Sequence, residues 1–128
     1  MRRFDDATPI YVQIAEEIRT QILSGELAEG ARLTSTTEYA ARYRINPATA
    51  NKAVALLVDE GLVVKRRGIG MFVADGALAG LRRGRRAAYA DDVLHPALDA
   101  GLALGLRDAE LRDAVAQYLE SRARKESQ

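Results

Sequence analysis

The chain has 128 residues, of which 48% are hydrophobic, and a formal net charge of +1, so it can form one ordinary globular domain or a small domain with an appendage. Because it has no cysteine and a single histidine, cysteine-based redox chemistry is excluded and little remains for metal ligation or acid–base catalysis. No apolar run approaches the roughly 18 residues that cross a bilayer, and the first residues lack the apolar core of a signal peptide, which predicts a cytoplasmic protein without membrane contact.

The first predicted helix begins at Thr8 and Pro9, where threonine can cap and proline suits the first turn, and it ends at Gly25. A turn follows over residues 26–33, with a short strand expected near 32–34. Along this first helix, apolar residues recur every four positions, which predicts one buried stripe. The stripe consists of Ile10, Ile14, Ile18 and Ile22.

The second predicted helix is short, beginning at Ser35 and ending near Tyr43. Ser35 and Glu38 have the spacing of a capping box, in which the serine hydroxyl accepts from one free N–H and the glutamate reaches back to another.

The third predicted helix runs from Pro47 to about Glu60 and opens on short polar side chains. Asn46 can cap its first free N–H groups, proline suits the first helical position, and Gly61 supplies the left-handed residue that stops it. Two short helices joined by a tight turn, the second with exposed polar groups in its first turns, describe a helix-turn-helix. The predicted inner face of this helix consists of Ala50, Ala53, Val54, Leu57 and Val58.

A β-hairpin is predicted next, because the strand-like runs 62–66 and 71–73 are separated by Arg67-Gly68-Ile69-Gly70. Its tip carries glycine and positive charge. We interpret this hairpin as the wing of a winged helix-turn-helix.

From about Ala77 the sequence becomes a helical mixture that Gly105 breaks before a last helix. Pro96 removes a helical hydrogen bond, which predicts a kink or break after His95. Two helices cannot bury their apolar stripes alone; they can fold back over the winged domain, but pairing in a homodimer gives a more complete core. The predicted dimer contacts are Leu81, Tyr89, Val93, Leu94, Leu98, Leu102, Leu111, Val115, Tyr118 and Leu119.

The predicted fold class is therefore mainly α with a small β-hairpin: a winged helix-turn-helix DNA-binding domain over residues 1–75 and a helical dimerisation tail over 76–128. The charges support a nucleic-acid partner. Residues 42–86 contain ten basic and three acidic residues, a local balance of +7 that leaves −6 for the flanks. A basic face of this kind is the electrostatic footprint expected for binding a phosphate backbone.

Five motifs occur in a fixed order: Pro9-Ile10-Tyr11-Val12-Gln13-Ile14, Ile22-Leu23-Ser24-Gly25-Glu26-Leu27, Gly30-Ala31-Arg32-Leu33-Thr34-Ser35, Glu60-Gly61-Leu62 and Arg67-Gly68-Ile69-Gly70-Met71-Phe72-Val73. In this order they resemble the winged domain of the GntR superfamily of bacterial transcription regulators. The Asn-Pro-x-Thr start of the third helix and the short tail resemble its YtrA-type branch. The resemblance implies a dimer that binds a near-palindromic operator in double-stranded DNA, usually repressing its own operon, which in this branch often encodes transporters.

The resemblance places the recognition helix at Asn46 and the residues after it. There, Asn51 can pair with adenine, Lys52 with guanine or a phosphate, and Thr49 with a phosphate or a thymine methyl group. The wing arginines would contact the backbone or the minor groove. The DNA-binding residues predicted in this way are Ser35, Thr36, Thr37, Arg44, Asn46, Ala48, Thr49, Asn51, Lys52, Arg66, Arg67 and Gly68.

Three residues depart from the family pattern: Pro96, which interrupts the tail helix, and two residues of the winged domain. Thr37 stands where most relatives have an arginine that contacts DNA, so we expect one backbone contact fewer and more of the binding on the recognition helix and the wing. Arg44 stands where relatives usually have glycine, so it must accept a positive φ at some cost or shift the turn. Both departures in the winged domain support an alternative function, a winged-helix protein-interaction module with weakened DNA binding.

Other signals have simpler interpretations. Gly68 and Gly70 precede a strand and lack a third glycine, so they do not form a dinucleotide fingerprint. His95, beside Pro96, is interpreted as a structural residue at a helix break, and the nearby Asp91, Asp92 and Asp99 as an exposed acidic face. The cluster Arg82, Arg83, Arg85 and Arg86 fits either a DNA-backbone patch or a contact with the dimer partner.

No nucleophile–base pair and no metal cluster can be assembled from these residues, so neither an enzymatic activity nor a cofactor is predicted. A small-molecule effector of unknown identity, binding between the tail and the winged domain, is left open as a further partner, although no polar cluster in the sequence marks a pocket for it.

Overall fold

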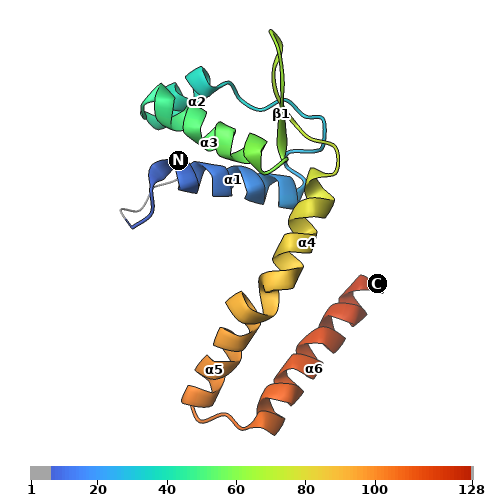
Figure 1. Cartoon of the computed structure of the whole chain (residues 1–128). Coiled ribbons are helices and arrows are strands. Elements are labelled where there is room, and N and C mark those ends of the chain that lie inside the picture. The colour runs from blue at the N-terminus through green and yellow to red at the C-terminus, as the bar shows by residue number, and fades with distance from the viewer. Residues whose placement is uncertain (1–6, 128) are drawn as a thin grey trace. The chain divides into compact units, whose positions relative to one another are not determined.

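The computed structural model describes residues 7–127 (Figure 1). In chain order its elements are α1 (Ile10–Ser24), α2 (Thr36–Tyr43), α3 (Pro47–Asp59), β1 (Val63–Arg66), β2 (Gly70–Val73), α4 (Ala77–Tyr89), the π-helical turn η1 (Ala90–Leu94), α5 (His95–Ala103) and α6 (Asp108–Glu126). The predicted class, mainly helical with one small hairpin, is confirmed. Contacts divide the chain into a winged unit, residues 1–84, and a tail unit, residues 85–128.

α1 supplies one wall of the core of the winged unit. Ile14, Ile18 and Ile22 are at most 4% exposed, as the predicted stripe requires. The stripe is wrong at its start, because Ile10 is the first helical residue and is 39% exposed. Pro9 rather than a threonine side chain occupies the capping position of α1.

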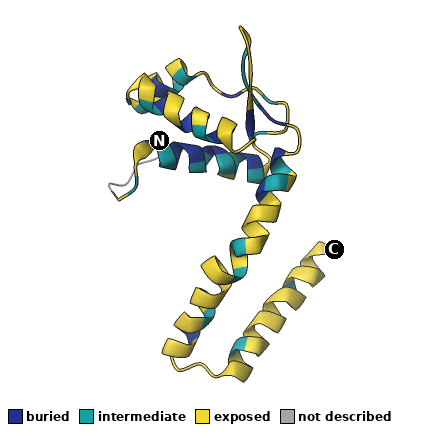
Figure 2. Ribbon diagram, in the orientation of Figure 1, coloured by how far each residue is buried: buried dark blue, intermediate teal, exposed yellow. Residues whose placement is uncertain are grey.

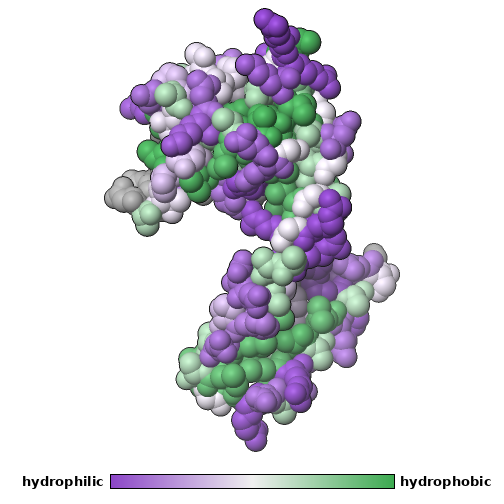
Figure 3. Space-filling view, in the orientation of Figure 1, coloured by the Kyte–Doolittle hydropathy of each residue, from purple (hydrophilic) through white to green (hydrophobic). Residues whose placement is uncertain are grey.

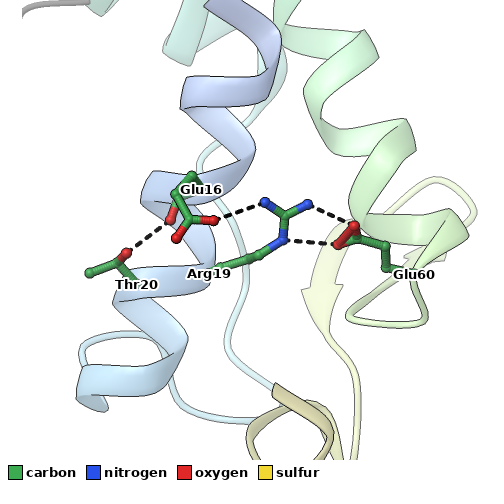
Figure 4. A network of polar contacts seen from close by, with 4 residues as sticks. All are labelled: Glu16, Arg19, Thr20 and Glu60. Atoms are coloured by element: carbon green, nitrogen blue, oxygen red, sulfur yellow. Dashed lines mark hydrogen bonds and ion pairs between the residues drawn. The ribbon is translucent and has the colours of Figure 1, made fainter. Parts of the chain in front are cut away.

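An ion pair ties α1 to the end of α3 (Figure 4). The Arg19 guanidinium donates to both carboxylate oxygens of Glu60, at 2.9 and 2.7 Å, and to Glu16 at 3.1 Å. The hydrogen bond with Glu60 is the main cause of a raised pKa of Arg19. Because the Arg19 side chain is only 14% exposed, this pair is screened less than an ordinary surface pair.

Local capping by Ser35 and Asn46 fixes the helix-turn-helix as predicted, but within the described residues the Glu38 side chain does not make the return bond of the predicted capping box. Ser35 Oγ accepts the Glu38 N–H at 3.1 Å at the start of α2, and Asn46 Oδ1 accepts the Ala48 N–H at 2.9 Å at the start of α3. Between the two helices Arg44 has φ 55° and ψ 48°, so it adopts the left-handed conformation instead of shifting the turn. This conformation is strained for a residue other than glycine.

The wing is a two-stranded antiparallel hairpin in which Val63 pairs with Val73 and Arg66 with Gly70. A third segment lies beside β2, since the Leu33 N–H donates to the Met71 carbonyl at 2.8 Å and Arg32 forms an antiparallel bridge with Phe72. The predicted short strand near 32–34 is therefore present as a single bridge. It anchors the loop before α2 to the hairpin.

The core of the winged unit lies between α1, α3, the hairpin and the first turns of α4 (Figure 2). Leu57 and Val63 are buried at its centre, at 0% and 1% exposed, whereas Val58, predicted on the inner face, is 37% exposed. Leu81, predicted as a dimer contact, is 8% exposed and packed in this core together with Ala77, one helical turn earlier. It is thus buried within a single chain.

The tail unit contains two antiparallel helices, α5 and α6, joined by a turn in which Gly105 has φ 90° (Figure 1). They approach closely at Gly101, where an added Cβ would lie 2.8 Å from Leu111 Cδ2. Hydrophobic residues form a band over this unit (Figure 3). The large apolar residues exposed there are Tyr89, Val93, Leu94, Leu102, Leu104, Leu106, Val115, Tyr118 and Leu119.

The predicted interruption near Pro96 takes the form of a widened turn rather than a break. In η1 the His95 N–H donates to the Ala90 carbonyl, five residues back, and both Leu94 and His95 keep helical φ and ψ. Proline lacks an N–H and its ring clashes with the carbonyl four residues before it. A π-type turn just ahead of the proline relieves that clash while the helix continues.

Candidate nucleic-acid interface

The first turns of α3 present short side chains at the surface of the winged unit. Ala48, Asn51 and Lys52 are exposed and Thr49 is partly buried, while Asn46 is fixed by its bond to the Ala48 N–H. Because these side chains are small or unbranched, the helix can approach the floor of a DNA major groove closely.

Asn51 and Lys52 point in different directions from α3, as neighbours about 100° apart on a helix must. Asn51 lines a groove that faces the wing. The Lys52 ammonium lies 4.2 Å from the centre of the Tyr11 ring on α1, in a cation–π contact. This contact, which no local sequence pattern indicates, holds the charge on the α1 side.

The wing carries positive charge along its strand and at its tip. The Arg66 guanidinium stacks 4.6 Å above the Phe72 ring, which holds it on one face of the hairpin. Arg67 and Gly68 lie exposed at the tip, where Gly68 has φ 77°. The predicted basic, glycine-containing tip is therefore present.

A groove of about 570 Å³ runs between α3 and the wing. It brings together five of the predicted DNA-binding residues, Ser35, Thr36, Asn51, Arg66 and Gly68. The other predicted residues do not line this groove: Thr37, Arg44, Asn46, Ala48, Thr49, Lys52 and Arg67.

Two basic residues of the groove, Arg32 and Lys65, are absent from the set predicted from the sequence. The available signal for Arg32 is its place beside Leu33 in the predicted short strand, since neighbouring strand residues point to opposite faces and Leu33 is buried. Asp59 also lines the groove and is its acidic residue.

Outside the groove, His95, the nearby aspartates and the arginine cluster of α4 are exposed. His95 Nδ1 lies 3.3 Å from an Asp91 carboxylate oxygen, and both side chains are more than half exposed. No group of three or more His, Cys, Asp or Glu side chains within residues 7–127 could hold a metal ion, and no helix in that range is long and apolar enough to cross a membrane. The four arginines of the α4 cluster are exposed: Arg82, Arg83, Arg85 and Arg86.

Comparison with known proteins identifies the family. The family model described as "Bacterial regulatory proteins, gntR family" matches residues 10–73, which is half of the chain and covers the helix-turn-helix and the wing. The chain belongs to the GntR family. The family expected from the five sequence motifs is therefore confirmed.

Similar proteins extend the match beyond the winged unit. The HTH-type transcriptional repressor YtrA of Bacillus subtilis is 31% identical over 94 residues, which is 73% of this chain and 72% of YtrA. A GntR family transcriptional regulator from Listeria monocytogenes superposes with a TM-score of 0.69 at 27% identity, over 89% of this chain and 98% of that one. The predicted YtrA-type branch is thus supported over both units.

A second similar structure contains DNA. AraR(DBD) in complex with operator ORR3 is 28% identical, with a TM-score of 0.52, over 58% of this chain and 89% of that one. The chain spans only part of three further curated regulators, namely 32%, 62% and 26% of their lengths. The relatives are named as transcriptional regulators or repressors, a non-enzymatic role that agrees with the prediction from the sequence.

Proposed function

We propose that this GntR-family chain is a dimeric transcriptional repressor that binds an inverted-repeat operator in double-stranded DNA. The observation that carries the proposal is the row of short polar groups on α3 beside a basic hairpin within one compact unit. A related domain solved with its operator supports the same use of the winged unit.

In this proposal α3 enters the major groove and reads bases mainly through Asn51, whose amide can pair with adenine. Thr49 contacts a phosphate or a thymine methyl group. Lys52 is assigned to the DNA backbone, because its ammonium is held over the Tyr11 ring on α1 and not on the side of α3 that faces the wing. Arg44, in its left-handed turn, adds a positive charge between α2 and α3.

The tail unit would supply the dimer contact. Val93, Tyr118 and Leu119 are more than half exposed. Exposure of such a band of large apolar side chains to water is energetically unfavourable. Pairing with a second copy through a two-fold axis would cover the band. Two recognition helices related in this way read two half-sites, spaced about one helical turn or 34 Å apart.

The alternative function, a protein-interaction module, keeps one observation in its favour. Thr37 is exposed on the first turn of α2, where relatives carry an arginine, so one positive charge expected near DNA is missing. An interaction module would not need that charge.

A gel-shift titration separates the two functions. The full chain would be titrated against the duplex upstream of its own gene and against a scrambled duplex of equal length and composition, each at two KCl concentrations. A repressor shifts the upstream duplex at lower concentration and weakens steeply with salt, because phosphate contacts release counterions. Absence of any salt-sensitive shift would favour the interaction module.

A further inference from the structure

Two arginines from different segments flank Gly70 on one face of the wing. Arg66 is the cross-strand partner of Gly70 in the hairpin register. Arg32 reaches the same glycine from the loop before α2, since a Cβ added to Gly70 would lie 2.9 Å from Arg32 Nε and 3.5 Å from Arg32 Cζ. The missing side chain of Gly70 therefore makes the space that the Arg32 guanidinium occupies.

The backbone holds both arginines in place. Arg32 is bridged to Phe72 across the ribbon, and the Phe72 ring supports the Arg66 guanidinium at 4.6 Å. Leu33, the next residue, is anchored by its N–H to the Met71 carbonyl and by burial in the core. Little conformational freedom of the backbone would be lost when a ligand binds there.

Neither guanidinium forms an ion pair within the part of the chain that the structure describes. Both line the α3–wing groove with Ser35, Thr36 and Asn51, so they share a surface with the helix expected to read bases. Two unneutralised guanidiniums beside hydroxyl and amide donors match the chemistry of a phosphodiester, which offers acceptor oxygens and a negative charge.

We propose that Arg32 and Arg66 form a phosphate-binding site for the DNA backbone. This site rests on the proposed DNA-binding function and adds to it Arg32, which is not among the DNA-binding residues predicted from the sequence. It supplies from the loop before α2 the positive charge that Thr37, at the start of α2, does not carry. Its ligand is a backbone phosphate and not a base, so it strengthens binding to every DNA sequence alike.

Equilibrium binding of the full chain to the upstream and scrambled duplexes, measured over a series of KCl concentrations, tests the site. Arg32→Gln keeps most of the aliphatic stem and removes the charge. We expect it to weaken binding to both duplexes by the same factor and to lower the slope of log affinity against log salt by about one for each phosphate that is no longer neutralised. Arg66→Gln should do the same, and Arg32→Lys should retain most of the slope because it retains the charge.

The matched control is Arg124→Gln. It removes an exposed arginine from α6 on the side of the helix opposite to Val115 and the apolar face. Thermal unfolding of each variant checks that the fold is intact. If Arg32→Gln unfolds, the salt slopes of Arg32→Lys and Arg66→Gln still test the site. Parental binding combined with unchanged slopes for Arg32→Gln and Arg66→Gln would overturn the site and leave the proposed function standing. A parent that binds neither duplex at any salt concentration would overturn both.

Discussion

The winged unit and the tail unit contain similar proportions of apolar residues but bury them very differently (Figure 2). In the winged unit the large side chains converge on one core, where Ile14, Leu57 and Val73 are at most 1% exposed. Among the described residues of the tail unit only Gly101 is buried, and most of the large apolar side chains are exposed. The first unit buries most of its large hydrophobic residues within one chain, whereas the second leaves most of them exposed, which is why we propose a dimer contact there.

The largest expected effect on stability lies in the core of the winged unit. Leu57→Ala should lower the free energy of unfolding by about 2–5 kcal/mol, because it removes buried methyl groups and leaves a cavity. Leu104→Ala in the tail, where the side chain is 83% exposed, should change it by less than about 0.5 kcal/mol. Urea denaturation measures both changes in the free energy of unfolding. Equal effects of the two substitutions would contradict the difference in burial between the units.

The next largest effect concerns the exposed band of the tail. Val115→Asp combined with Leu119→Asp should convert a dimer to a monomer in sedimentation experiments, because it places charges in an apolar contact. Operator affinity should fall by roughly 100-fold or more, since two half-sites are then bound independently. The helical circular dichroism signal that the winged unit contributes should be retained. A variant that stays dimeric would show that the band serves another purpose.

Base reading and backbone contact should separate at neighbouring positions of α3. Asn51→Ala should remove about 1–3 kcal/mol of discrimination between the upstream and scrambled duplexes. Lys52→Ala should weaken binding to both duplexes by a similar factor. It should also cost about 0.5–1 kcal/mol of stability, because it removes the cation–π interaction with Tyr11. Competition binding and thermal unfolding supply the two readouts. If both variants reduced discrimination equally, the assignment of Lys52 to the backbone would be wrong.

Arg44 should trade stability against binding. Arg44→Gly relieves the strain of the left-handed conformation at φ 55° and should stabilise the chain by about 1 kcal/mol, while removing a positive charge from the turn that we propose faces DNA. Higher unfolding temperature together with weaker DNA binding is the expected pair of results. Arg44→Ala removes the charge but keeps the strain, so it should weaken binding without the gain in stability.

The smallest effect is a pH dependence in the α1–α2 contact. Tyr39 donates to a Glu17 carboxylate oxygen at 3.1 Å, and burial, followed by the charge of Glu17, raises the pKa of Tyr39 above its usual value. The folded chain therefore holds this proton more tightly than the unfolded chain does. Stability from this group should be complete below about pH 10 and decline as the pH rises above it. Tyr39→Phe should flatten that decline in urea titrations at about pH 8 and pH 11, on either side of the usual tyrosine pKa.

Features set by neighbouring residues could be predicted from the sequence. The caps at Ser35 and Asn46, the stop at Gly61 and the glycine-containing wing all depend on interactions within a few positions, and the structure contains them. For Arg44 the sequence leaves two conformations open, of which the structure selects the left-handed one. The family follows from the order of such local motifs.

Features set by distant contacts could not be predicted. Leu81 and the exposed leucines of the tail have the same helical spacing, and only the position of the core shows that Leu81 is buried. Lys52 lies over Tyr11 across 41 positions of sequence, and Arg32 reaches Gly70 across 38, so neither contact leaves a local pattern. The widened turn at Ala90–Leu94 precedes the predicted kink by a few residues, because the proline acts on the carbonyl before it.

The central claim is that the winged unit binds DNA sequence-specifically, and one titration tests it most directly. Fluorescence anisotropy of the labelled upstream duplex, competed with unlabelled upstream or scrambled duplex across a KCl series, reports specificity and phosphate contacts together. The account predicts preferential competition by the upstream duplex and an affinity that falls as a steep power of the salt concentration. Equal competition by both duplexes, with an affinity that does not change with salt, would contradict it.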